Sequence, residues 1–113
     1  NAIDYDLFFT GWGPDYNDPM TDLDLWVTDG GNNHSGYSSA EYDALIEAAK
    51  VETDLVAREQ LFVQMELLLA EDMPIIPIFW RAEDYVVSEK MESGYTRMPF
   101  QQINLFYTRL ADE

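Results

Sequence analysis

The stretch GWGPDYNDP, residues 11 to 19, decides how this chain is interpreted. It packs two glycines, two prolines, an asparagine and two aspartates into nine positions, and its first two residues end the apolar run YDLFFTGW of residues 5 to 12. An apolar run that ends at a glycine and proline cluster is typical of a buried strand. We therefore predict a strand over residues 5 to 12 that is covered on both faces and ends in this loop.

Three interpretations of the loop can be compared: a turn, a metal loop and a ligand site. A calcium loop of the EF-hand type, counted from Asp15, would need an oxygen ligand at Pro19, glycine at Met20 and glutamate at Trp26, so that template fails. In open α/β sheets, ligands bind beyond the carboxyl ends of strands. Both a turn and a ligand site remain open at this point.

The side chains of the loop suit a ligand with a positive group. Trp12 offers a flat apolar face, Gly13 permits close approach of a ligand, and the Asp15 carboxylate can pair with a cation or an ammonium group. The alternative is structural: Trp12 belongs to the core and Asp15 caps the turn before the next helix. The residues alone do not decide between the two.

Composition excludes several classes of function. The 113 residues suffice for one core, and 22 acidic against 6 basic residues give a net charge of -16, which repels nucleic acids and anionic membrane surfaces. Cysteine is absent and His34 is the single histidine, so a transition-metal site or a Ser-His-Asp triad lacks partners. No carboxylate pair is marked as catalytic. We expect no enzyme activity, no catalytic residues, no cofactor and no bound metal.

Helices are indicated after the loop. A short helix is expected from Pro19 to Thr28, with a buried stripe of Leu23, Trp26 and Val27. The pattern SSAE of residues 38 to 41 predicts a capping box with Ser38 as the N-cap. The helix that follows has apolar residues at the 3.6 period, and a second begins after Asp54 and runs to Met73. The stripes of these two helices consist of Tyr42, Leu45, Ile46 and Ala49, and of Leu61, Phe62, Met65, Leu68 and Leu69.

The remainder of the chain is predicted to form strands. IIPIFW at residues 75 to 80 predicts an edge or bulged strand because Pro77 cannot donate to a ladder. Further strands are expected over residues 85 to 88 and 103 to 110, with a turn-rich connection over 94 to 99. The alternation of strands and helices predicts a mixed sheet with about three helices, an α/β fold.

Three blocks carry a resemblance to a known family. They are DYDLFFTGWGPDYNDP at residues 4 to 19, GNNHSGYSSAEYDALI at 31 to 46 and AEDMPIIPIFW at 70 to 80. In this order they resemble the C-terminal part of the extracytoplasmic solute-binding proteins of dipeptide and oligopeptide ABC transporters, solute-binding protein family 5. Because the chain opens on Asn1 rather than Met, we expect a piece of such a protein.

The resemblance implies a two-lobed periplasmic-binding-protein fold of type II, whose lobes close over the ligand. Residues 1 to 82 would belong to the ligand-binding lobe, and residues 83 to 113 would form the crossover and the return strand toward the other lobe. The expected partners are a peptide or another small solute and the membrane permease of an ABC importer. The expected location is periplasmic or extracellular, with attachment to the cell surface where an outer membrane is absent. Exposed apolar surface predicts that the isolated chain self-associates.

The resemblance also implies roles for individual residues. The aspartate of the GW-x-x-D pattern, Asp15, would pair with the α-amino group of the ligand, while the backbone at Trp12 and Gly13 would bond an extended peptide. Phe9 stands where some oligopeptide binders carry an arginine for the peptide carboxylate. Arg81 stands where relatives often carry an aromatic residue, so it would favour acidic or short ligands. Asn17 is a further candidate.

The sequence also leaves other ligands and other classes of protein open. An oligosaccharide stacked on Trp12 or a chelated nickel ion would fit within the family, and a calcium-bound structural domain or a hydrolase would lie outside it.

Overall fold

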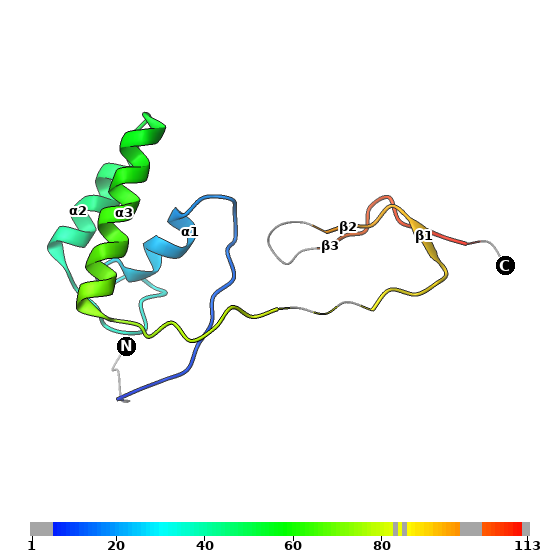
Figure 1. The fold of residues 1–113 in the computed structure, drawn as a ribbon, viewed down its shortest axis with the longest axis horizontal. Coiled ribbons are helices and arrows are strands. Elements are labelled where there is room, and N and C mark those ends of the chain that lie inside the picture. The colour runs from blue at the N-terminus through cyan, green and yellow to red at the C-terminus, as the bar shows by residue number, and fades with distance from the viewer. Residues whose placement is uncertain (1–5, 83, 85, 98–102, 112–113) are drawn as a thin grey trace.

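The computed structural model describes residues 6–82, 84, 86–97 and 103–111. Its helical part consists of α1 (Met20–Leu23), the 3-10 turn η1 (Asp24–Trp26), α2 (Ala40–Val51) and α3 (Leu55–Asp72). Helices α2 and α3 run antiparallel side by side, and α1 lies across them (Figure 1). Their buried side chains form one core, which consists of Met20, Leu23, Tyr42, Ile46, Ala49, Phe62 and Met65. The predicted stripes of the two long helices are therefore confirmed.

The helix ends follow from capping side chains. Asp54 is the N-cap of α3, as predicted, because its Oδ1 accepts a hydrogen bond from the amide of Ala57 at 2.8 Å. The N-cap of α2 is Ser39, whose Oγ accepts from the amide of Tyr42 at 3.2 Å, so the predicted cap at Ser38 was wrong by one residue. Two adjacent serines offer the same hydroxyl, and the packing of Tyr42 in the core selects between them.

A buried hydrogen bond fixes α1 to α2. The hydroxyl of Tyr42 donates to the carbonyl oxygen of Leu23 at 2.7 Å, inside the core. The side chain of Tyr42 is fully buried, and burial raises the pKa of its hydroxyl. Leu23 is the last residue of α1 and the N-cap of η1, so the bond ties the junction of these two helical turns to α2.

Four short strands follow at the other end of the chain. They are β1 (Met91–Ser93), β2 (Thr96–Arg97), β3 (Ile103–Asn104) and β4 (Arg109–Leu110). Antiparallel pairing joins β2 to β3 and β1 to β4, so the pairs are nested along one hairpin. The residues predicted as a connection, 94 to 99, thus include β2, while 98 and 99 lie outside the described residues.

The single strand predicted over residues 103 to 110 was wrong. A turn separates β3 from β4, closed by a hydrogen bond from the amide of Thr108 to the carbonyl of Leu105 at 3.0 Å. The side chain of Asn104 starts this turn by accepting from the amide of Phe106 at 2.9 Å. Asparagine competes with ladder pairing in this way, which explains why an apolar run does not continue as one strand.

The other predicted strands were wrong as well. Residues 7 to 14, 76 to 82 and 86 to 88 have no regular secondary structure, and Tyr5 and Tyr85 lie outside the described residues. Leu7, Phe9 and Trp80 are 82%, 74% and 99% exposed, so these segments are not buried. A strand needs a neighbouring backbone, and the described part of the chain supplies none to them.

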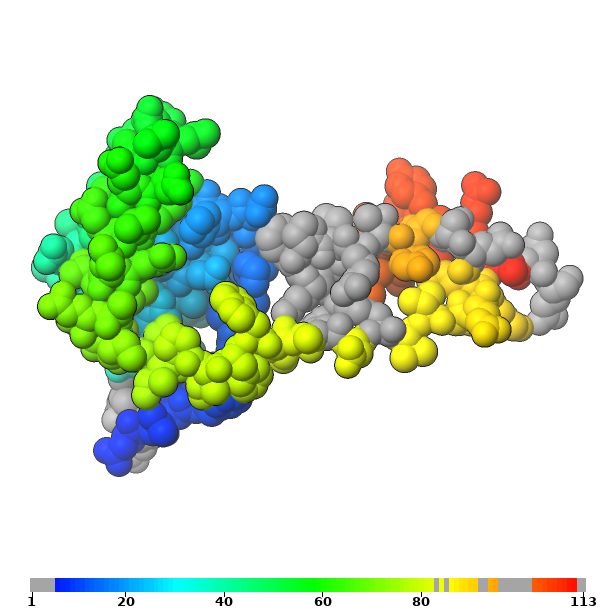
Figure 2. Space-filling view, in the orientation of Figure 1, coloured from blue at the N-terminus to red at the C-terminus, as the bar shows by residue number. Residues whose placement is uncertain are grey.

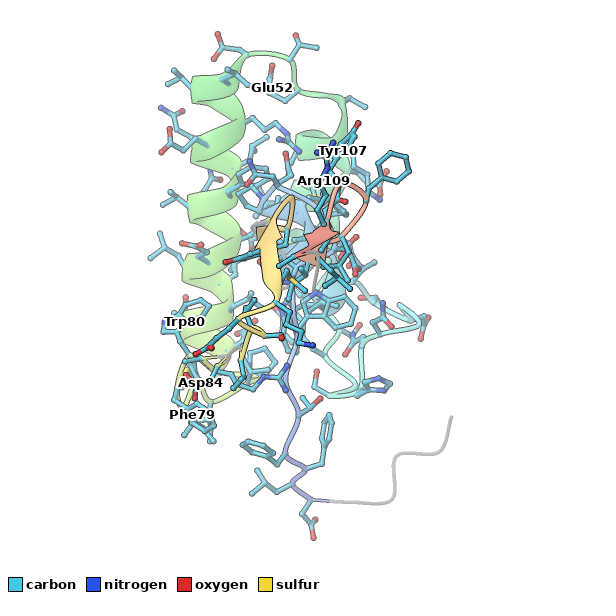
Figure 3. All side chains as sticks on the ribbon, turned by 90° about the vertical axis from the view of Figure 1, so that its right-hand side faces the viewer. Glu52, Phe79, Trp80, Asp84, Tyr107 and Arg109 are labelled. Atoms are coloured by element: carbon cyan, nitrogen blue, oxygen red, sulfur yellow. The ribbon has the colours of Figure 1, made fainter. Side chains whose placement is uncertain are left out.

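The whole structure is elongated, with extents of 62 × 40 × 23 Å. The extended segment after α3 leads from the helical part to the strands (Figure 2). Phe79 and Trp80 project from this segment near the C-terminal end of α3, at the opposite end of the helix from Glu52 (Figure 3). Within the described ranges, no helix has the length and apolar character that crossing a membrane requires.

Candidate functional site

The loop of residues 11 to 19 is held against α1 by its own backbone. The amide of Asp15 donates a hydrogen bond to Oγ1 of Thr21 at 3.0 Å. Thr21 lies in α1 and is only 3% exposed, so this acceptor belongs to the rigid helical part. The backbone position of Asp15 is therefore fixed while its side chain is exposed to solvent.

A second anchor lies three residues further along the loop. The carboxylate of Asp18 accepts two hydrogen bonds from Arg58 of α3, 2.5 Å from Nη1 to Oδ2 and 3.0 Å from Nη2 to Oδ1. The same carboxylate accepts from the amide of Met20 at 2.9 Å. The bonds from Arg58 hold the pKa of Asp18 below its usual range, and they raise the pKa of Arg58.

Arg58 connects three elements. Its Nε donates to the carbonyl oxygen of Ala49 in α2 at 3.0 Å, and its guanidinium lies 4.6 Å from the ring centroid of Phe62 in α3. The planar guanidinium can make all of these contacts at once because its donors point in fixed directions. Sequence reasoning missed Arg58, although it is the single basic residue among residues 51 to 80.

The structural alternative for Trp12 and Asp15 was wrong on both counts. Trp12 is 45% exposed, so it does not belong to the core, and Gly13 beside it is half-buried. The first amide of α1 bonds to Asp18 rather than to Asp15. In the described part of the chain, no residue donates a hydrogen bond to the Asp15 carboxylate, which leaves that carboxylate accessible to a ligand.

The other candidate residues lie on the same loop or near the segment that precedes it. Asn17 is exposed in the loop itself. Phe9 stacks at a tilt on Phe79, with ring centroids 6.4 Å apart, so the segments before the loop and after α3 lie next to each other. Arg81 is two residues beyond Phe79 and is exposed. The structure thus brings the segments of Phe9 and Arg81 together.

The charge around the loop is negative. Burial raises the pKa of Asp22 and of Asp24, and the nearby Asp15 raises that of Asp24 further, while Lys50 opposes it. Neighbouring carboxylates at an exposed loop create a potential that attracts positive groups. Among the described residues, no cluster of three or more acidic or histidine side chains is arranged to hold a metal ion. The negative potential around the loop suits a ligand that carries a positive group.

Two relatives of this chain are described as peptide-binding proteins of Bacillus subtilis. The dipeptide-binding protein DppE of Bacillus subtilis is 34% identical over 104 residues, which cover 92% of this chain and 19% of DppE. The oligopeptide-binding protein OppA of the same organism is 32% identical over 93 residues, 81% of this chain and 17% of OppA. No family model matches the sequence.

A solved structure agrees with these relatives. The substrate-binding domain of an oligopeptide ABC transporter from Bacillus anthracis aligns with a TM-score of 0.74 and 30% sequence identity over 89% of this chain and 20% of that one. The α/β fold class is thereby confirmed. The chain spans about one fifth of the length of these proteins. It belongs to the family of dipeptide- and oligopeptide-binding proteins of ABC transporters.

Proposed function

We propose that this chain forms part of a receptor that binds peptides for uptake by an ABC importer, with the ligand's amino group paired to Asp15. The proposal rests on the position and the exposure of Asp15. Its backbone is held by a hydrogen bond to the buried Thr21. Its carboxylate is exposed and accepts no hydrogen bond from the described residues. A fixed carboxylate in a negative field favours an ammonium group. The relatives' descriptions as dipeptide- and oligopeptide-binding proteins supply the ligand class.

The backbone beside Asp15 suits the rest of an extended peptide. Trp12 and Gly13 lie outside any strand, and within the described residues their amides and carbonyls have no backbone partner. A peptide could therefore add its own backbone hydrogen bonds along this edge, a mode that tolerates different side chains. Trp12 would cover the peptide with its exposed ring, and Phe9 and Asn17 would flank the ligand.

The proposed roles of the two parts of the chain follow the family fold. Residues 1–82 would contribute to the ligand-binding lobe, and residues 83–113 would cross toward the other lobe. The protein would act outside the cytoplasmic membrane and present its closed form to a membrane permease. One relative, from Salmonella typhimurium, is described as a periplasmic oligopeptide-binding protein. Neither catalysis nor a cofactor is part of the proposal.

Arg81 would adjust the choice of ligand. Its guanidinium lies on the segment that contacts Phe9, and a positive group at that place favours peptides with acidic side chains or a nearby carboxylate. In the complete protein, Arg81→Ala should weaken acidic peptides selectively. An equal loss for acidic and neutral peptides would show that Arg81 does not select.

A different solute is the specific alternative. One relative from Escherichia coli, 32% identical over 80 residues, is described as a probable deoxycholate-binding periplasmic protein. Calorimetry of the complete protein with dipeptides, tripeptides, an oligosaccharide, a chelated nickel ion and deoxycholate separates these ligand classes. We expect heat of binding with the peptides. Binding of another solute in their place would overturn the proposal.

A further inference from the structure

The contact between Arg58 and Asp18 reaches beyond the stability of the helices. Asp18 lies only three residues from Asp15, whereas Arg58 lies on α3, 40 positions further along the chain from Asp18. Their bidentate contact ties the loop to α3. The other hydrogen bonds that hold this part of the loop join it to α1: the amide of Asp15 donates to Thr21, and the amides of Met20 and Thr21 donate to Asp18.

We propose that Arg58 is a positioning residue for the ligand, acting through Asp18 on the place of the Asp15 carboxylate. The proposal rests on the proposed function, in which Asp15 receives the ligand's amino group. Arg58 itself is committed elsewhere: its Nη atoms to Asp18, its Nε to Ala49, and its guanidinium face to Phe62. It therefore affects the ligand only through the geometry of the loop.

A lysine cannot replace this arrangement. The guanidinium offers two parallel donors to Asp18 and a third to Ala49, while an ammonium group is a single centre at the end of a flexible stem. With Arg58→Lys the charge beside Asp18 is retained, but the two parallel bonds that tie the loop to α3 are replaced by one rotating contact. The Asp15 carboxylate would then sample several positions, and each ligand would have to fix it on binding.

The matched partner variant is Asp18→Asn. Asparagine, like aspartate, can bond the backbone two residues on, so its side-chain oxygen can still accept from the amide of Met20, while the charge that holds both Nη atoms is lost. Both variants are conservative in size. Arg109→Lys serves as the control, because it makes the same change of side chain at an exposed arginine of β4, outside the loop and the helices.

The test measures, on the complete protein, the dissociation constants of one dipeptide and of its N-acetylated form, together with the melting temperature. We expect Arg58→Lys and Asp18→Asn to weaken the free-amine peptide by about tenfold, which is about 1.4 kcal/mol. The acetylated peptide should weaken much less, because it does not use Asp15. Arg109→Lys should leave both constants unchanged.

The outcomes separate the two levels of the argument. If the unmodified protein binds both peptides equally, the proposed function of Asp15 fails. If it discriminates between them and both variants discriminate as strongly, the positioning inference alone is overturned. Equal weakening of the two peptides along with a lowered melting temperature would assign Arg58 a purely structural role and would also overturn it.

Discussion

Arg58 and Asp18 form a bidentate ion pair in which Nη1 lies 2.5 Å from Oδ2 and Nη2 lies 3.0 Å from Oδ1. Both side chains are largely buried, with 23% of Arg58 and 28% of Asp18 exposed. The pair joins the loop of residues 11 to 19 to α3. Because α3 packs in the core through Phe62 and Met65, the pair connects this otherwise irregular segment to the core.

The first prediction concerns pH. The bonds from Arg58 lower the pKa of Asp18 in the folded state below its unfolded value. The stabilisation is therefore fully present above the unfolded pKa, near 4, and is lost as the pH falls through the lower folded pKa. We expect urea denaturation to show Asp18→Asn less stable than the unmodified protein by about 1 to 2 kcal/mol at pH 7, with the gap closing toward pH 2.

The control for this titration is Asp29→Asn. Asp29 is exposed and has a φ of 56°, a conformation that asparagine tolerates. At pH 7 Asp29→Asn should be as stable as the unmodified protein. A gap for Asp18→Asn that stayed constant down to pH 2 would contradict the assigned role of its charge.

The second prediction concerns the buried bond between Tyr42 and Leu23. Tyr42→Phe removes the hydroxyl and leaves the Leu23 carbonyl buried without this donor, which should cost about 1 to 3 kcal/mol of unfolding free energy. Tyr107→Phe is the control, because Tyr107 is 73% exposed. Thermal denaturation of both variants checks the difference. Equal melting temperatures would show that the hydroxyl contributes little.

The third prediction concerns the turn between β1 and β2. Gly94 has a φ of +87°, and a Cβ there would lie 1.7 Å from the carbonyl oxygen of Tyr107. Gly94→Ala should therefore open the pairing of β1 with β4, because both the backbone conformation and the space exclude a side chain. Gly31→Ala is the control, since a Cβ at Gly31 meets no atom within 4 Å.

Hydrogen exchange is the appropriate measurement for this turn. Amides of β1 and β4 should exchange faster in Gly94→Ala, while those of α2 and α3 should be unchanged. Unaltered exchange in β1 would mean that the turn can accept a methyl group.

The fourth prediction concerns the 113-residue chain on its own. Ile76, Ile78 and Trp80 on the extended segment are 67%, 68% and 99% exposed, which is unusual for large apolar side chains gathered on one segment. We expect the chain to self-associate, and more strongly at high salt, because salt screens the repulsion between copies of net charge -16. Sedimentation equilibrium should show the mass rising with concentration.

A variant that combines Ile76→Ser, Ile78→Ser and Trp80→Ser should associate less, whereas Val51→Ser, at the end of α2, should associate as strongly as the unmodified chain. A monomer at all concentrations and salt levels would contradict the prediction.

The helices could be predicted from the sequence because their causes are local. The N-cap at Asp54 and the apolar stripe from Leu61 to Leu69 lie within one segment, so the information needed for α3 is contiguous. The strands failed because a strand depends on a neighbour elsewhere. The apolar run before Trp12 has the composition of a buried strand, yet the described residues provide no backbone to pair with it.

Of the candidate site, the loop of residues 11 to 19 could be predicted, because the glycine and proline pattern is local turn chemistry. The ligand-binding role of Asp15 stays a prediction. Arg58 was missed because its contact with Asp18 spans 40 positions, and no local pattern records such a distance. The sequence did offer one signal for Arg58: it is the single basic residue in the predicted helix after Asp54, which contains several acidic residues.

The most direct test of the central claim combines Asp15→Asn with N-acetylation of the ligand. Calorimetry of the complete protein measures four dissociation constants: each protein form with a free dipeptide and with its acetylated form. We expect a coupling energy of at least about 1.5 kcal/mol between the carboxylate and the amino group, so that Asp15→Asn weakens only the free dipeptide. Additive effects, with Asp15→Asn weakening both dipeptides equally or neither, would contradict it.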